Sequence, residues 1–189
     1  MSCLNGAKSG ELTLILGPMF SSKSLMMYAH FAPLAYTNEK HELFTSEKNP
    51  RDKWSRSEVL IKYTKIRSLA SIIEQPYAVI GIDEIHMFEP EEADIIKKIL
   101  LQGTHVFASG LDMDYRGIVY EIVIRLLGLG PTAVDYRKAA CHVCKKGNAA
   151  FTQIFHYGVS VLEGLPPIVV DDGTYEYRSA CLKHFVRKL

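Results

Sequence analysis

The sequence predicts an α/β fold with a mostly parallel sheet and a small metal-binding lobe at its C-terminal end. Short apolar runs alternate with segments whose apolar residues recur at helical spacing, which is typical of such folds. Three of the four cysteines gather after residue 140, outside this alternation. With 189 residues, 48% of them hydrophobic, the chain is long enough for one domain with its own core and a small appendage. We therefore expect one unit over residues 1–138 and a second over residues 139–189.

The first half of the chain starts the alternation. Apolar runs predict strands at residues 12–16, 41–45 and 59–63. Helical periodicity predicts helices at residues 22–34, with Pro33 in the last turn, and at residues 69–73. The segment 46–57 is charged and contains Pro50, so we expect it to be a surface loop.

The second half continues with a more buried strand. Residues 78–82 form a continuous apolar run, as expected for a strand that is covered on both faces of a parallel sheet. Residues 89–101 have an acidic first turn and one apolar face, which indicates a helix. A further strand is predicted at residues 105–108. The segment 118–127 is rich in β-branched residues, so propensity allows a strand, but we predict a helix there.

A strand, a tight loop, a Lys-Ser pair and a helix follow one another near the N-terminus, which is the layout of a phosphate-binding P-loop. In such a loop the backbone N–H groups and the helix N-terminus attract a polyphosphate. Lys23 is expected to reach the β- and γ-phosphates, and the Ser24 hydroxyl to bind Mg²⁺. Ser22 stands where the pattern has Gly, whose backbone turns more freely. The predicted ATP-binding residues are Gly17, Pro18, Met19, Phe20, Ser21, Ser22, Lys23 and Ser24. Taken alone, the motif could also be an ordinary strand, turn and helix.

Two adjacent carboxylates, Asp83 and Glu84, follow the buried strand at residues 78–82. Ligands bind at the carboxyl edge of open α/β sheets, so this pair and the P-loop can share one crevice. Asp83 is expected to serve Mg²⁺ and Glu84 the attacking nucleophile. The alternative is a solvated pair of charges at a strand end, which is common; the upstream Lys-Ser pair favours the functional interpretation.

Ligand-type residues occur in two pairs after residue 140, a Cys-Cys pair and a Cys-His pair. In each pair two residues separate the two ligands, which is the spacing of zinc knuckles. The predicted metal ligands are Cys141, Cys144, Cys181 and His184. Four protein ligands close a tetrahedral site, so this zinc would be structural and not catalytic. His142 offers another nitrogen, but a direct neighbour of Cys141 in a tight knuckle is expected to point away.

The charge pattern gives no case for a nucleic-acid or membrane partner, because the net charge is only +1 and charges of both signs are interspersed. No apolar run approaches the roughly 20 residues that a membrane-spanning helix needs. Residues 1–6 lack the organisation of a signal peptide. We therefore expect a cytoplasmic protein, in which clustered cysteines indicate a metal before a disulfide.

These motifs, together with Asp83 to Phe88 and Ser109 to Asp112, resemble those of the type II thymidine kinases, which combine a P-loop domain with a zinc-binding domain. The resemblance extends from about residue 10 to about residue 184 and keeps the order of the family's motifs. It implies that ATP phosphorylates the 5′-hydroxyl of thymidine in nucleotide salvage, with deoxyuridine as a second substrate. It also implies a homotetramer and inhibition by thymidine triphosphate.

The resemblance assigns roles residue by residue. Glu84 matches the general base, and Lys23, Ser24 and Asp83 match the phosphate and magnesium residues. A segment around residues 168–177 is similar to the loop that closes over the nucleoside. The residues implied to bind the nucleoside are Met19, Leu111, Tyr115, Thr152, Ile168, Val170 and Tyr177.

The sequence differs from the family pattern at four places. Ser22 replaces the P-loop Gly, Asp172 replaces the first glycine of the closing loop, and Ile154 replaces a common Arg. The family's Asp-x-Arg appears only as Asp52-Lys53-Trp54. They motivate one alternative, a catalytically weakened relative that binds nucleosides or nucleotides. A second alternative is a P-loop ATPase whose zinc lobe contacts nucleic acid, against which the near-neutral charge argues.

Overall fold

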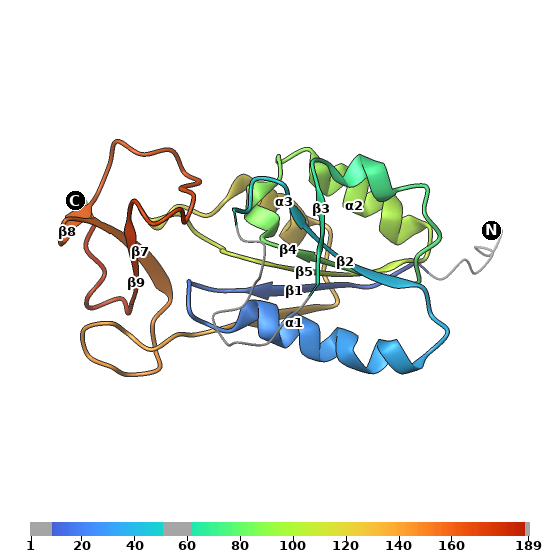
Figure 1. Ribbon diagram of the computed structural model, residues 1–189, viewed down its shortest axis with the longest axis horizontal. Coiled ribbons are helices and arrows are strands. Elements are labelled where there is room, and N and C mark those ends of the chain that lie inside the picture. The colour runs from blue at the N-terminus through green and yellow to red at the C-terminus, as the bar shows by residue number, and fades with distance from the viewer. Residues whose placement is uncertain (1–8, 51–61, 188–189) are drawn as a thin grey trace, which may run out of the picture.

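A computed structural model describes residues 9–50 and 62–187. The molecule is elongated, with a large α/β part and a smaller β-rich part at the C-terminal end (Figure 1). Helix α1 covers one face of the large sheet, and helices α2 and α3 cover the other. Within the described ranges, no helix is long and apolar enough to cross a bilayer.

The large sheet has six parallel strands in the order β3-β2-β4-β5-β1-β6. Its strands are β1 (Leu12–Leu16), β2 (His41–Ser46), β3 (Thr64–Ile66), β4 (Val79–Asp83), β5 (His105–Gly110) and β6 (Ala133–Tyr136). The α-helices are α1 (Lys23–Phe31), α2 (Glu92–Leu101) and α3 (Glu121–Gly128), and the 3-10 helices are η1 (Ala32–Tyr36), η2 (Leu69–Ile72) and η3 (Ile85–Met87). The small sheet is antiparallel in the order β8-β7-β9, with β7 (Phe151–His156), β8 (Val159–Val161) and β9 (Glu176–Ala180).

The hydrophobic core lies on both faces of the large sheet, because its central strands are apolar at nearly every position. On one face, residues of α2, α3 and η2 pack against β1, β4 and β5. On the other face, Met27 and Phe31 of α1 pack with Ile15 and Leu43. A Cβ at Gly81 would lie 2.4 Å from the Leu43 side chain and 3.0 Å from the Phe31 ring, so only glycine lets α1 pack this closely. Each fully buried large side chain stabilises the fold by about 1.5–3 kcal/mol.

Most predicted elements of the large sheet are confirmed. Strands β1, β2, β4 and β5 lie where the apolar runs placed them, and α2 and α3 are helices, although they begin at Glu92 and Glu121 and not at residues 89 and 118. The β-branched stretch is helical because its buried residues lie on one face, against the sheet.

Four predicted segments differ in part from the structure. The helix predicted for residues 22–34 ends at Phe31, and the next residues form η1, since Pro33 has no N–H for an α-helical hydrogen bond. Of the helix predicted at residues 69–73, Leu69–Ile72 form 3-10 helix η2 and Ile73 is its C-cap. Of the strand predicted at residues 59–63, residues 59–61 lie outside the described ranges and Tyr63 is not in a strand; β3 begins at Thr64, where pairing with Phe44 of β2 starts. The loop prediction for residues 46–57 is overturned at Ser46, the last residue of β2, and residues 51–57 lie outside the described ranges.

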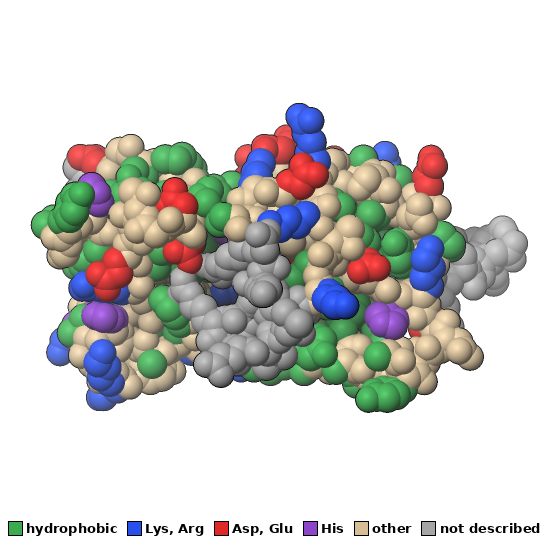
Figure 2. Space-filling model, viewed as in Figure 1, with side chains coloured by type: hydrophobic (Ala, Val, Ile, Leu, Met, Phe, Trp, Pro, Cys, Tyr) green, Lys and Arg blue, Asp and Glu red, His purple; other side chains and the backbone are tan. Residues whose placement is uncertain are grey.

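The surface is mixed in charge. On the face seen in Figure 2, Lys and Arg side chains are interspersed with Asp and Glu side chains over the described part of the chain. The long acidic and basic side chains also pair locally, as in the contacts of Arg178 with Glu176 and of Arg125 with Glu121.

Candidate active site

The P-loop, which follows β1, has a positive φ at three positions: Gly17, Phe20 and Ser22. Gly17 has φ of +144°, and a Cβ there would lie 2.4 Å from the carbonyl oxygen of Arg137. Ser22, at the start of α1, has φ of 60° and ψ of 30°, in the left-handed region, and its side chain makes no capping hydrogen bond. Ser22 thus adopts the backbone conformation that glycine adopts without strain.

Lys23 points back into the P-loop. Its Nζ donates to the Pro18 carbonyl oxygen at 2.6 Å and lies 3.4 Å from the Ser21 hydroxyl, which itself donates to Pro18 at 2.8 Å. The Lys23 side chain is largely buried. A buried ammonium group at the centre of a loop of backbone N–H groups is suited to bind an anion.

Asp83, the last residue of β4, is 4% exposed and accepts several hydrogen bonds. Its Oδ1 accepts from the Ser109 hydroxyl and from the Glu84 backbone N–H, the latter at 3.0 Å. Its Oδ2 accepts from the Tyr63 hydroxyl at 2.9 Å. Burial and the neighbouring Glu84 raise the pKa of the Asp83 carboxyl, and the hydrogen bonds from Ser109, Ser24 and Tyr63 lower it in part. Asp83 and the P-loop hydroxyl Ser24 are therefore neighbours.

Glu84 has a left-handed backbone, with φ of 54°, at the junction between β4 and η3. Its side chain is 17% exposed and its Oε2 lies 3.5 Å from Nδ1 of His86. The same nitrogen accepts a hydrogen bond from the Leu111 backbone N–H at 3.2 Å, which requires the tautomer without a proton on Nδ1. Both carboxylates line the cavity described next, and the Glu84 side chain is the more exposed of the two.

A cavity of about 320 Å³ joins these elements. The lining comes from the P-loop with the start of α1, the segment after β2, the end of β4 with η3, the residue after β5, and β9 with the segment before it. The lining residues are Met19, Phe20, Ser21, Ser22, Lys23, Ser24, Leu25, Asn49, Pro50, Asp83, Glu84, His86, Met87, Leu111, Val169, Asp171 and Tyr177. The structure thus brings together the lysine, the hydroxyl and both carboxylates that the sequence singled out.

The residues expected to bind the nucleoside are distributed less simply. Met19, Leu111 and Tyr177 line the cavity, and the Tyr177 hydroxyl donates to the Val169 carbonyl at 3.0 Å. In the closing segment, Val169 and Asp171 line the cavity, whereas Ile168 and Val170 are not among the lining residues.

Tyr115 and Thr152 are not among the residues that line the cavity. Tyr115 is buried, and its hydroxyl donates to the Leu165 carbonyl at 3.0 Å and accepts from the Leu165 N–H at 3.2 Å. Thr152, on β7, accepts a hydrogen bond from the backbone N–H of Met19 at 2.9 Å. This bond connects the P-loop directly to the small sheet.

Several lining or supporting residues were missed by sequence reasoning. His86 and Met87 lie in the segment quoted for the resemblance, which could have indicated them, as could Ser109. Tyr63 and Asn49 carry no local signal, because only the fold brings them to the end of β4 and the P-loop.

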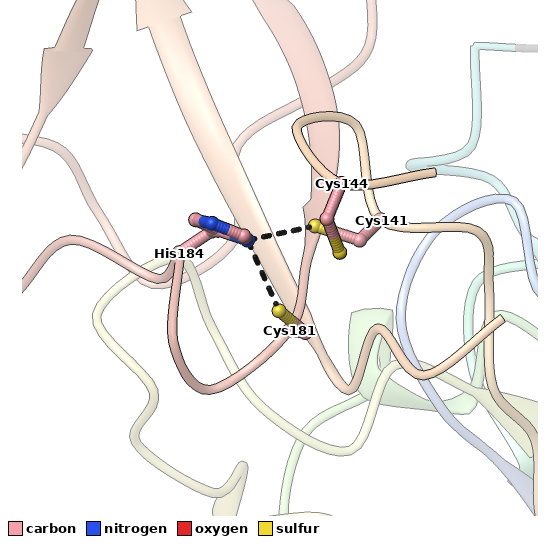
Figure 3. Close-up of side chains that lie close together, drawn as sticks. All are labelled: Cys141, Cys144, Cys181 and His184. Carbon is pink, nitrogen blue, oxygen red and sulfur yellow. Dashed lines mark hydrogen bonds between the residues drawn. The ribbon is translucent and has the colours of Figure 1, made fainter. Parts of the chain in front are cut away.

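The second group lies in the small lobe (Figure 3). The ligand atoms of Cys141, Cys144, Cys181 and His184 all lie within 4.8 Å of one another. His184 Nδ1 is 3.6 Å from the Cys141 sulfur and 3.3 Å from the Cys181 sulfur. Ligand atoms at about 2.0–2.3 Å from one tetrahedral ion are spaced in this way, so the donor set fits a metal ion. His142 is exposed and outside this set, as predicted.

The knuckle backbone favours the metal-binding form of the Cys141 thiol. Burial raises the pKa of the Cys141 thiol, but hydrogen bonds from backbone N–H groups of both knuckles outweigh this and lower the pKa to about 5. The thiolate is the form that binds a metal.

Comparison with known proteins agrees with this geometry. A family model described as thymidine kinase matches residues 10–185. The chain belongs to the thymidine kinase family. It is 28% identical to a thymidine kinase of Pseudothermotoga lettingae over 154 residues, which covers 78% of this chain and 83% of the relative. It is also 28% identical to a thymidine kinase of Mycoplasma capricolum over 201 aligned positions, which covers 96% of this chain and 91% of the relative. The chain is thus an enzyme of the thymidine kinase class, as the motif resemblance implied.

Proposed function

We propose that this enzyme transfers the γ-phosphoryl group of ATP to the 5′-hydroxyl of thymidine, with Mg²⁺, and that deoxyuridine is a second substrate. The main support is that Glu84 and the P-loop residues Lys23 and Ser24 line one cavity. Phosphoryl transfer needs a carboxylate near the nucleophile and a cationic cradle for the phosphates, within reach of each other.

On the phosphate side, the loop from Gly17 to Ser24 holds the triphosphate through its backbone N–H groups. Lys23 exchanges its present contact with the Pro18 carbonyl for the β- and γ-phosphates. Ser24 and Asp83 would hold Mg²⁺, which supplies charge neutralisation of the phosphates. Both hydroxyl and carboxylate oxygens suit this hard cation.

On the nucleoside side, Glu84 accepts the proton of the 5′-hydroxyl while the bond from that oxygen to the γ-phosphorus forms and the bond to ADP breaks. Met19, Leu111 and Tyr177 surround the base, supported by their place in the cavity lining. The nucleoside roles of Ile168, Val170, Tyr115 and Thr152 are proposed on the resemblance. Thr152 would act through Met19, whose backbone N–H it binds.

For the small lobe we propose a structural zinc ion held by the three cysteines and His184. These four ligands would fill the tetrahedral coordination of the ion and leave no position for a substrate. The division near residue 138 is supported by the separate sheets. A homotetramer, inhibition by thymidine triphosphate and a cytoplasmic location are proposed on the resemblance alone.

The test is transfer from ATP with Mg²⁺ to thymidine, run beside deoxyuridine, deoxycytidine and deoxyguanosine with the zinc-loaded full-length protein. The proposal predicts thymidine and deoxyuridine monophosphates and little product from the other two. Binding of thymidine without any product would instead favour the catalytically weakened relative.

A further inference from the structure

Tyr63 makes a contact that neither the P-loop motif nor the paired carboxylates explain. Its hydroxyl donates to Oδ2 of Asp83 at 2.9 Å. The Ser24 hydroxyl lies near both the Tyr63 hydroxyl and the Asp83 carboxylate, and Ser24 and Asp83 line the same cavity. One phenol thus contacts one of the two side chains that the proposed function assigns to magnesium and lies near the other.

The contact spans the sheet. Tyr63 directly precedes β3, and in the sheet order β2 lies between β3 and β4, whose last residue is Asp83. Two strand spacings amount to about 10 Å. Only a long side chain with a polar end bridges this distance, and the phenol of Tyr63 does so.

The Asp83 carboxylate is held from several directions. Ser109 and the Glu84 N–H occupy Oδ1, and Tyr63 occupies Oδ2. A carboxylate has about four acceptor positions, so these donors leave it little freedom to rotate.

We propose that Tyr63 is a positioning residue for the magnesium site, one that holds Oδ2 of Asp83 and the Ser24 hydroxyl in the arrangement in which they receive the cation. This inference rests on the proposed function, because that function supplies the magnesium roles of Asp83 and Ser24. Tyr63 touches neither nucleoside nor phosphate in this assignment and acts through its two neighbours.

The experiment measures affinity and not turnover. The full-length protein is titrated by calorimetry with a non-hydrolysable ATP analogue, once with Mg²⁺ and once with a chelator, and separately with thymidine. Tyr63→Phe is expected to bind the magnesium nucleotide about tenfold more weakly, since a hydrogen bond to a charged group is lost. Its affinities for the metal-free nucleotide and for thymidine stay within twofold of wild type. Tyr77→Phe, which removes a hydroxyl from a ring packed on Phe44, is the control and binds like wild type.

A double-mutant cycle separates positioning from general loosening of the fold. In an Asp83→Asn background, Tyr63→Phe is expected to change magnesium-nucleotide affinity less than twofold. Ser109→Ala, which removes the donor on the other side of the carboxylate, is expected to act in the same direction as Tyr63→Phe.

The outcomes are distinct. Equal magnesium-nucleotide affinity in wild type and Tyr63→Phe overturns the inference and leaves the proposed function intact. The positioning role of Tyr63 is also overturned if Tyr63→Phe weakens nucleotide binding as much in the Asp83→Asn background as in wild type. It is overturned likewise if the loss of nucleotide affinity is equally large without Mg²⁺. If wild-type affinity itself does not depend on Mg²⁺, the proposed function falls and this inference with it.

Discussion

Replacing Ser22 by Gly is expected to stabilise the enzyme. Ser22 lies in the left-handed region, with φ of 60°, and this conformation costs a non-glycine residue about 1–2 kcal/mol. Its side chain makes no capping hydrogen bond, so truncation removes no such interaction. Glycine also increases the entropy of the unfolded chain, which offsets about 0.5–1 kcal/mol of the gain. The net expectation is an increase of about 0.5–1 kcal/mol in the free energy of unfolding.

For a chain of this size, that gain corresponds to a rise of about 1–4 °C in Tm. The assay is thermal and urea unfolding of the nucleotide-free protein, followed by titration with the magnesium nucleotide. Ser22→Ala is the matched control, because it removes the hydroxyl but keeps the Cβ in the left-handed region; its Tm should not rise. ATP affinity of Ser22→Gly should equal or exceed that of wild type.

The reasoning is refuted if Ser22→Gly is less stable than wild type, or if Ser22→Ala is stabilised to the same extent. Either result would mean that the serine is not under left-handed strain. It would also remove the physical reason to regard Ser22 as the substitute for the glycine of a P-loop.

Three further predictions concern the loop, the buried carboxylate and the metal lobe. Gly17→Ala should cost about 1–3 kcal/mol in urea unfolding, because its Cβ would lie 2.4 Å from the Arg137 carbonyl oxygen; unchanged stability would count against the loop geometry. Burial raises the pKa of Asp83, so the folded state favours the protonated carboxyl. The contribution of Asp83 to the free energy of unfolding is therefore present at low pH and is lost as the pH rises from about 4 through the raised pKa. The Tm of the nucleotide-free wild type should therefore fall more between pH 5 and pH 8 than that of Asp83→Asn; equal slopes would contradict this. Cys181→Ser should lower both metal content and ATP affinity, because the Thr152 hydroxyl connects the lobe to the P-loop; full ATP affinity after metal loss would exclude this coupling.

The parts of the site that are contiguous in sequence could be predicted. The P-loop is a local motif, since one strand, one loop and one helix contain all of its groups. Asp83 follows a strand whose apolar run marks it as buried, and parallel strands bring their carboxyl ends to one edge. The cysteine spacing predicts the metal-binding group because each knuckle is also local.

The parts that depend on distant pairing could not be predicted. Thr152 meets Met19 across 133 residues of sequence, and Tyr63 meets Asp83 across two strand positions; neither contact leaves a periodic signal. Strands β6, β8 and β9 are short and largely half-exposed, so their apolar alternation is weak.

The closing segment shows a further limit. Side chains alternate between the two sides of an extended chain, so a shift of one residue exchanges those that face a cavity for those that face away. The resemblance pointed to Ile168 and Val170, whereas Val169 and Asp171 line the cavity in the structure. Sequence alone places this segment at the site but does not decide which alternate side chains face inward.

The most direct test of the central claim is a single-turnover measurement of phosphoryl transfer in Glu84→Gln. If Glu84 accepts the proton of the nucleophile, the transfer rate falls by about 10²–10⁴-fold. The affinities for thymidine and for the magnesium nucleotide should stay within a few-fold of wild type, because the amide is isosteric. Glu89→Gln, on an exposed carboxylate paired with Lys48, is the control and should transfer at the wild-type rate. Wild-type transfer by Glu84→Gln would contradict the account.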